Sequence, residues 1–247
     1  MNRLSLIAIA CAASTTALGL LTSPAQAASL GELIESNGTF TDEHLTFSNF
    51  NMQVACLDFN NSNATCDDLF AAGHIRPTSA FQIGVGPATT PHGPGIRFND
   101  FFRAEDGYGI DIALSYDVKS TKPIDKFHLS FDSVLDSGQV EIIETASDMN
   151  GNPIGQLFAD NITEKQDPNN KVPDLATSGS FSKSVYEFQI LKDINLTSEI
   201  GTGLSNMTTV DQEYSSVPEP LTILGSAAAL GFGVAFKKEQ SRKKSQK

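Results

Sequence analysis

The stretch Tyr108–Lys119, YGIDIALSYDVK, alternates apolar and polar residues without a break. Tyr108 and every second residue up to Val118 are aromatic or aliphatic, whereas Gly, Asp, Ala, Ser and Lys stand between them. Successive side chains of a strand point to opposite faces, so this pattern predicts a strand with one buried face.

The same alternation recurs along the chain. Lys126–Val134 and Val185–Ile190 repeat it, and the second of these places Tyr186 on the inward parity. Residues 45–54 change parity near Ser48 and Asn49, which predicts a β-bulge in one long strand. Weaker strands are predicted at Thr78–Val85, Gly95–Phe102, Gly138–Thr145, Pro153–Asp160 and Thr208–Tyr214.

Turn signals separate these segments and set the fold class. Asp136-Ser137-Gly138 and the Asn150-Gly151 pair are typical of tight turns between strands. Leu30–Ser36 is the one stretch of the body that favours a short helix. We therefore predict an all-β domain over residues 28–212, an antiparallel β-sandwich of jelly-roll-like type.

The charge distribution limits the partners of this domain. Between Ala28 and Val217 the chain carries 10 basic and 27 acidic residues. A body this acidic repels phosphate backbones, which excludes nucleic acid as a partner.

The N-terminus is typical of a secretory signal peptide over residues 1–27. Arg3 gives the positive start, residues 4–21 are apolar or small, and Ala25 and Ala27 form a small-x-small cleavage site. We expect export through the Sec translocon and a mature chain that begins at Ala28.

The C-terminus combines three features in a fixed order. A linker over residues 213–220 ends in Val217-Pro218-Glu219-Pro220, where the prolines keep the backbone extended. Leu221–Phe236 has no charged residue and predicts a single short transmembrane helix. A basic tail over residues 237–247 follows, which predicts a cytoplasmic end; its cations are Lys237, Lys238, Arg242, Lys243, Lys244 and Lys247.

This order resembles the PEP-CTERM sorting signal, and the run from Val217 to Gly225 is similar to the cyanobacterial version. The resemblance implies recognition at Pro218, Glu219 and Pro220 by an exosortase, a membrane cysteine protease, after transient anchoring in the inner membrane. It further implies delivery to the cell surface or extracellular matrix. Gly38–Phe50 and Gly93–Gly107 resemble uncharacterised PEP-CTERM ectodomains, which implies a β-rich surface domain without catalytic residues.

Two cysteines remain in the predicted mature body, Cys56 and Cys66. An even count in an exported chain predicts one disulfide between them. Asp148, Asn150 and Asn152 have the spacing of calcium-loop oxygens, but no acidic residue closes a twelve-residue loop. We therefore predict no cofactor and no metal site, with calcium as an alternative.

Catalytic motifs give little support to an enzyme. Asp136-Ser137-Gly138 matches one half of an aspartic-protease site, but no second copy is present. Glu141 and Glu144 are a pair of carboxylates of a kind common in an acidic body. His128 falls on the polar face of its strand, where a solvated side chain is expected. We predict no catalytic residue.

Three functions compete on this evidence. The first is a non-enzymatic surface or matrix protein, exported and sorted through its C-terminal signal. The second is a carbohydrate-binding module for exopolysaccharide, against which the absence of Trp counts. The third is an envelope hydrolase, which would require two converging carboxylates with raised pKa.

Overall fold

The computed structural model describes residues 28–59, 65–76, 79–88, 91–162, 175–201 and 203–217. The predicted signal peptide with Ala25 and Ala27, the motif residues Pro218–Pro220, the apolar segment Leu221–Phe236 and the basic tail lie outside the described residues. The chain divides into two compact units between Ser215 and Ser216, and the architecture below is that of the first.

Within the described ranges, no helix is long and apolar enough to cross a membrane.

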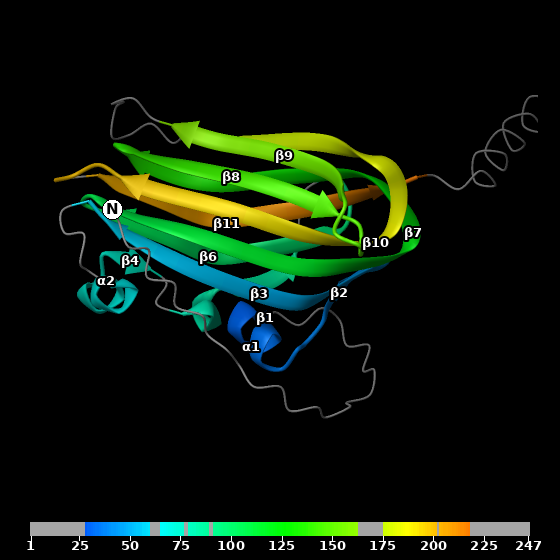
Figure 1. Cartoon of the computed structure of the whole chain (residues 1–247), viewed down its shortest axis with the longest axis horizontal. Coiled ribbons are helices and arrows are strands. Elements are labelled where there is room, and N and C mark those ends of the chain that lie inside the picture. The colour runs from blue at the N-terminus through cyan, green and yellow to red at the C-terminus, as the bar shows by residue number, and fades with distance from the viewer. Residues whose placement is uncertain are drawn as a thin grey trace, which may run out of the picture. The chain divides into compact units, whose positions relative to one another are not determined.

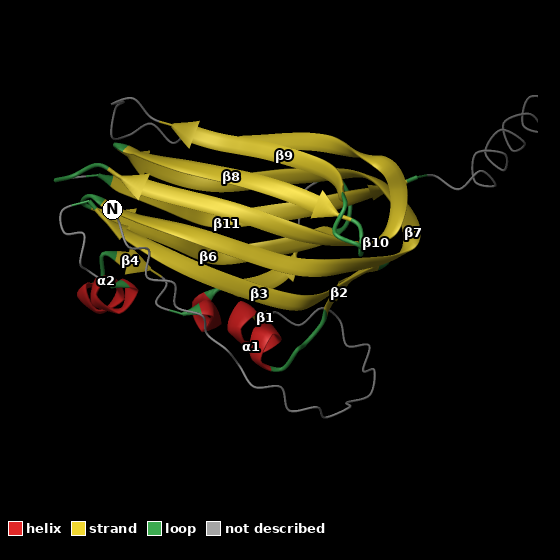
Figure 2. Ribbon diagram, viewed as in Figure 1, coloured by secondary structure: helices red, strands yellow, loops and turns green. Residues whose placement is uncertain are grey.

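Strands make up most of the body and run side by side along its long axis (Figures 1 and 2). They are β1 (Ala28–Ser29), β2 (Phe40–Asp42), β3 (Leu45–Asp58), β4 (Ile75–Arg76), β5 (Gly84–Pro87), β6 (Gly95–Glu105), β7 (Tyr108–Asp136), β8 (Gly138–Ser147), β9 (Pro153–Ile162), β10 (Leu175–Ser198) and β11 (Leu204–Ser216). The helices are α1 (Leu30–Glu35), α2 (Cys66–Ala72) and the 3-10 turn η1 (Ala80–Gln82). Each strand pair with a resolved register is antiparallel, which confirms the expected all-β class.

β7 and β10 are the longest strands, and they pair along almost their whole length. The stretch 175–180 of β10 lies opposite residues 126–131 of β7, and the stretch 187–197 lies opposite residues 109–119. Register shifts between Ser180 and Glu187 separate the two stretches. The two strands therefore bend together, and each contributes to two layers.

One layer contains β2, β3, the first half of β7, the second half of β10, β8 and β9. The other contains β1, β5, β6 with β4, β11 and the remaining halves of β7 and β10. Rings from strands that do not pair meet between the layers. The ring of Tyr214 in β11 lies 6.2 Å from that of Phe47 in β3 and 5.3 Å from that of Phe188 in β10. The body is thus a β-sandwich with an aromatic core.

The two α-helices begin at capping boxes. Ser29 accepts a hydrogen bond from the Glu32 amide at 3.2 Å, and Glu32 accepts one from the Ser29 amide at 3.0 Å. This confirms the helix expected at 30–36. α2 was not predicted, although Thr65 and Asp68 form the same box and Gly73 ends the helix with φ +79°. These three residues are the local signal that could have revealed it.

Two predicted strands differ from the structure, and a predicted bulge is confirmed. The predicted Lys126–Val134 strand is not separate, because β7 continues through it to Asp136. Thr78–Val85 is wrong as a strand, since η1 occupies its middle and β5 begins at Gly84. The bulge in β3 is confirmed: its register against β7 shifts between Ser48 and Asn51, and Asn49 has φ +53°.

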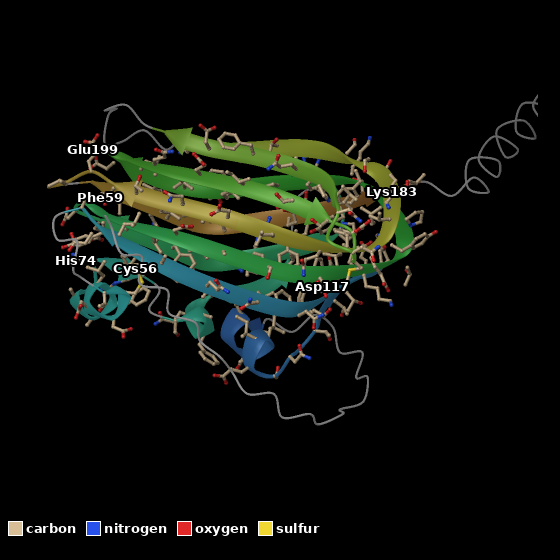
Figure 3. The ribbon with its side chains drawn as sticks, in the orientation of Figure 1. Cys56, Phe59, His74, Asp117, Lys183 and Glu199 are labelled. Carbon is tan, nitrogen blue, oxygen red and sulfur yellow. A yellow bond between two sulfur atoms is a disulfide. The ribbon has the colours of Figure 1, made fainter. Side chains whose placement is uncertain are left out.

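The predicted disulfide joins Cys56 of β3 to Cys66, the first residue of α2, with a Cα–Cα distance of 5.2 Å. It lies at the end of the body that carries α2 and His74 (Figure 3). The bond ties a short helix to the sheet, so it restrains a segment that the strand pairing alone does not hold.

Replacing both Cys56 and Cys66 with serine is expected to lower the free energy of unfolding by about 2–3 kcal/mol, because the unfolded chain regains the entropy of a short closed loop. Urea unfolding followed by circular dichroism measures the change, and reduced wild-type protein should show a similar loss. Equal urea midpoints for the oxidised wild type and the variant would contradict this account.

Candidate functional site

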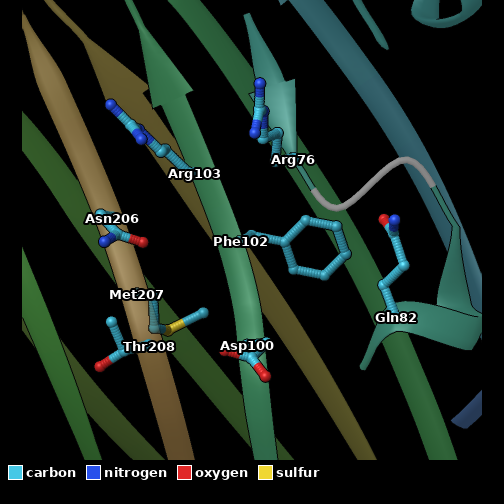
Figure 4. Close-up of a pocket in the computed structure, with 8 residues that line it drawn as sticks. All are labelled: Arg76, Gln82, Asp100, Phe102, Arg103, Asn206, Met207 and Thr208. Carbon is cyan, nitrogen blue, oxygen red and sulfur yellow. The ribbon is translucent and has the colours of Figure 1, made fainter. Parts of the chain in front are cut away.

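A hollow of about 420 Å³ opens on the β-sandwich where β4, η1, β6 and β11 meet. Eight residues line it (Figure 4): Arg76, Gln82, Asp100, Phe102, Arg103, Asn206, Met207 and Thr208. Phe102 and Met207 are buried, whereas the charged side chains are exposed at the surface. The accessible surface of the hollow is therefore a polar rim, and its two apolar residues lie buried beneath it.

An irregularity in β6 helps to shape the hollow. The register between β6 and β11 shifts between Met207 and Thr209, because an additional β6 residue lies between Asn99 and Phe102. Asp100 sits at this bulge with φ +55°, a conformation that Asp tolerates better than most residues. Bulges re-aim side chains, and here Asp100 lies beside Thr208 and Met207 at one end of the hollow (Figure 4).

Two guanidinium groups dominate the charge of the rim. Arg103 forms an ion pair with Glu105 of the same strand. Among the described residues, Arg76 has no ion pair. Arg97, further along β6, is already engaged, since it donates to both carboxylate oxygens of Asp211 at 2.7 and 2.6 Å. The hollow thus keeps a cationic donor available in an acidic body.

The residues singled out in the sequence do not gather at this hollow. Ala28 pairs with Val85 at the sheet edge, and Val217 is the last described residue. Asp148 uses its carboxylate inside its own loop, where it accepts from the amides of Asn150 and Asn152, both at 3.0 Å. The described residues hold no group of three or more His, Cys, Asp or Glu side chains placed to bind a metal.

The carboxylate pair Glu141 and Glu144 lies on opposite faces of β8. Glu144 is fully buried, and Glu141 is partly exposed on the other side. Asp136 ends β7 at a tight turn through Ser137, which has φ +57°. A turn explains the Asp-Ser-Gly motif, and these carboxylates do not converge on one site.

Two predicted orientations are wrong. Tyr186 is 55% exposed rather than inward, because the register shift between Val185 and Glu187 reverses its face. His128 is 8% exposed rather than solvated. Its ring lies 3.8 Å from that of His92, and its Nδ1 lies 2.7 Å from the Ser178 hydroxyl. Burial, followed by the charge of His92, lowers the pKa of His128.

The chain matches no protein-family profile and no curated protein. Among solved structures it is similar to TmCBM61 in complex with beta-1,4-galactotriose, at 10% identity and a TM-score of 0.31, over 67% of this chain and 88% of that one. It is also similar to the enzymatically active domain of tailspike protein 4 of bacteriophage CBA120, at 12% identity and a TM-score of 0.29, over 54% of this chain and 18% of that one. A structure of carbohydrate-binding modules from the β-sandwich superfamily matches at 8% identity and a TM-score of 0.24, over 80% and 64%.

Away from the hollow, two carboxylates lie diagonally across neighbouring strands on the solvent side of the first layer. Asp111 of β7 lies opposite Asn195 of β10, so it is a diagonal neighbour of Asp193. Partial burial, with a further contribution from the charge of Asp193, raises the pKa of Asp111. A raised carboxyl pKa in the folded state means that stability is lost as the pH rises through that pKa.

Asp111→Asn is therefore expected to stabilise the protein at neutral pH by less than about 1 kcal/mol, since the pair is partly exposed and screened. The gain should shrink as the pH falls, and thermal unfolding at several pH values measures it. Asp193→Asn should give a similar gain, and the double variant should gain less than the sum. Additive gains would show that the two carboxylates do not interact.

Proposed function

We propose that this chain is an exported surface protein whose β-sandwich binds a glycan in the hollow between β4, β6 and β11. The observation that carries the proposal is the lining of the hollow, a polar rim of guanidinium, amide, carboxylate and hydroxyl groups over Phe102 and Met207. Its volume of about 420 Å³ lies within the usual range for small-ligand sites.

The exposed polar side chains of the hollow suit the hydroxyl groups of a sugar ring. Arg76, Arg103 and Asn206 offer planar donors to ring hydroxyls, and Asp100 accepts from them. Two of the ten basic residues of the body border this one hollow, so it favours an anionic sugar such as a uronate.

The proposal is binding without hydrolysis. Most glycoside hydrolases need two carboxyl groups on either side of the scissile bond. Asp100 is the one carboxylate among the eight residues that line the hollow. Glu141 and Glu144, the pair weighed for this role, project from opposite faces of β8.

Arg76→Met is expected to weaken binding of a uronate polysaccharide about tenfold to a hundredfold, because a hydrogen bond to a charged group contributes about 1.5–3 kcal/mol. Affinity electrophoresis in gels containing alginate or pectate, with a neutral galactan in parallel, ranks the affinities. Lys183→Met is the matched control, since Lys183 lies at the opposite end of the body from β4 (Figures 1 and 3).

Failure of every polysaccharide to retard the wild-type protein would refute glycan binding. Equal retardation of the Arg76 and Lys183 variants would place the binding surface elsewhere. Stronger binding of the galactan than of alginate and pectate would show that charge does not select the ligand.

Export and sorting are a second part of the proposal, supported by the two ends of the sequence. Residues 1–27 have the pattern of a signal peptide, and Val217-Pro218-Glu219-Pro220 precedes an apolar segment and a Lys-rich tail. We propose that the apolar segment halts transfer in the inner membrane and that an exosortase-type protease then acts near the Pro-Glu-Pro motif. The β-sandwich would thereby reach the cell surface or matrix, where exopolysaccharide is the proposed ligand.

Terminal-peptide mass spectrometry of the protein from its own cells is expected to find chains that begin at Ala28 and end near Pro218–Pro220 in the surface fraction. Deleting residues 237–247 should reduce this product, because the basic tail holds the orientation. A surface chain that keeps Lys237 and the residues after it would contradict processing by an exosortase.

A further inference from the structure

Three polar side chains meet in the centre of the sandwich core. They are Lys192 of β10, Glu144 of β8 and Gln212 of β11, and each is fully buried. Lys192 and Glu144 lie directly opposite one another in the strand register. The Lys192 ammonium donates to Glu144 Oε2 and, across the two layers, to Gln212 Oε1 at 2.6 Å.

The surroundings of this cluster are apolar and closely packed. Tyr116 and Tyr214 are fully buried beside it, and Ile190 and Ile194 flank Lys192 on the same face of β10. Within the described part of the chain, Glu144 Oε1 and Gln212 Nε2 have no hydrogen-bond partner. A buried polar atom without a hydrogen-bond partner lowers the stability of the folded state, so the presence of two such atoms here requires a physical reason.

The protonation of the pair differs from that of a surface ion pair. Burial lowers the pKa of Lys192 and raises the pKa of Glu144, and the attraction between the two charges opposes both effects. Desolvation of this kind favours the neutral forms, a free amine and a protonated carboxyl group. A neutral amine is a nucleophile, and here it lies beside an amide carbonyl that its own hydrogen bond already polarises.

We propose that Lys192 and Gln212 become joined by an intramolecular isopeptide bond and that Glu144 transfers the protons. The Nζ lone pair attacks Cδ of Gln212, and the carbonyl π electrons move onto Oε1. Glu144 takes one proton from Nζ and delivers one to Nε2. The Cδ–Nε2 bond then breaks, the carbonyl forms again, and ammonia leaves. One amide replaces another, so no oxidant, reductant or cofactor is consumed.

The geometry assigns different roles to the two acyl groups. Gln212 is the acceptor because its carbonyl oxygen contacts the Lys192 amine, whereas its Nε2, the leaving nitrogen, has no hydrogen-bond partner among the described residues. Glu144 is the proton carrier because one of its oxygens contacts the attacking amine while the other has no partner. The isopeptide bond would link β10 to β11, so it would join the two layers of the sandwich covalently.

Tryptic peptide mapping of the folded wild-type protein tests the proposal directly. The sequence has Lys183 and Lys192 but no Lys or Arg from 193 to 236, so an unlinked chain is cut between Lys192 and Gln212. We expect that cut to disappear and a single peptide to appear that begins at Ser184 and extends beyond Gln212 to the next tryptic site or the end of the chain, lighter by one ammonia than its sequence predicts. Intact mass alone does not suffice, because a succinimide at Asn150-Gly151 also loses ammonia.

Glu144→Gln keeps the shape of the side chain but removes the proton carrier, and it should restore cleavage after Lys192. Glu141→Gln, on the opposite face of the same strand, is the matched control and should leave the cross-link intact. A cross-link that forms equally well in the Glu144 variant would overturn the assigned role of Glu144.

The wild-type map decides the question even if the Glu144 variant fails to fold. If protein that was folded before digestion is completely cleaved after Lys192, the proposal is overturned. A cross-linked peptide that joins Lys192 to the segment containing Glu144, lighter by one water, would also overturn it, since Glu144 would then be the acceptor.

Discussion

The antiparallel pairing of β7 with β10 is the constraint on which the rest of the structure depends. It runs from Leu175 opposite Phe131 to Thr197 opposite Gly109, interrupted by register shifts between Ser180 and Glu187. β3 and β8 add to its two sides in one layer, and β11 adds to β7 in the other. Because side chains alternate between faces, a slip of one residue along this pair would turn its core side chains outward. The layers are therefore held in register by the same two strands, and the aromatic contacts of Tyr214 with Phe47 and Phe188 fill the space that the bend encloses.

The alternation of apolar and polar residues predicted where strands occur, but it did not predict where one strand continues into the next. Tyr108–Val118 alternates without a break, and this pattern predicts a single strand. The bulge at Asn49 was visible in the sequence because the apolar residues change parity there. The interval around Lys122 and Pro123 breaks the alternation, which is why Lys126–Val134 was expected as a separate strand. β7 nevertheless continues through that interval as one strand, although its pairing with β10 shifts register there. Tyr186 was misplaced for the related reason that register shifts around Val185 reverse its face, and such shifts arise from the partner strand rather than from local sequence.

The hollow was beyond prediction from the sequence because its lining comes from four segments that only the fold brings together. Arg76 and Gln82 stand in a region of short elements, whereas Asn206 lies more than a hundred residues later. No spacing relates these residues, and the bulge at Asp100 that shapes the site is visible only against β11. The disulfide was predictable for the opposite reason. Cys56 and Cys66 are close in sequence, so cysteine count and the length of the intervening loop were sufficient.

The buried cluster was only partly predictable from the sequence. Its three polar residues stand at positions of the strand alternation that are normally apolar, which is an unusual composition for a core. Lys192 lies between Ile190 and Ile194 on the apolar parity, Glu144 follows Ile142 on that parity, and Gln212 stands between Val210 and Tyr214. A buried ion pair often contributes less to stability than well-packed apolar residues of similar volume, because desolvation offsets the attraction. Burial pushes Lys192 and Glu144 toward neutrality, and the amide of Gln212 satisfies the amine without adding charge. The arrangement that lowers the cost of burying a lysine is thus the same one that places a nucleophile, an acyl group and a proton carrier in contact.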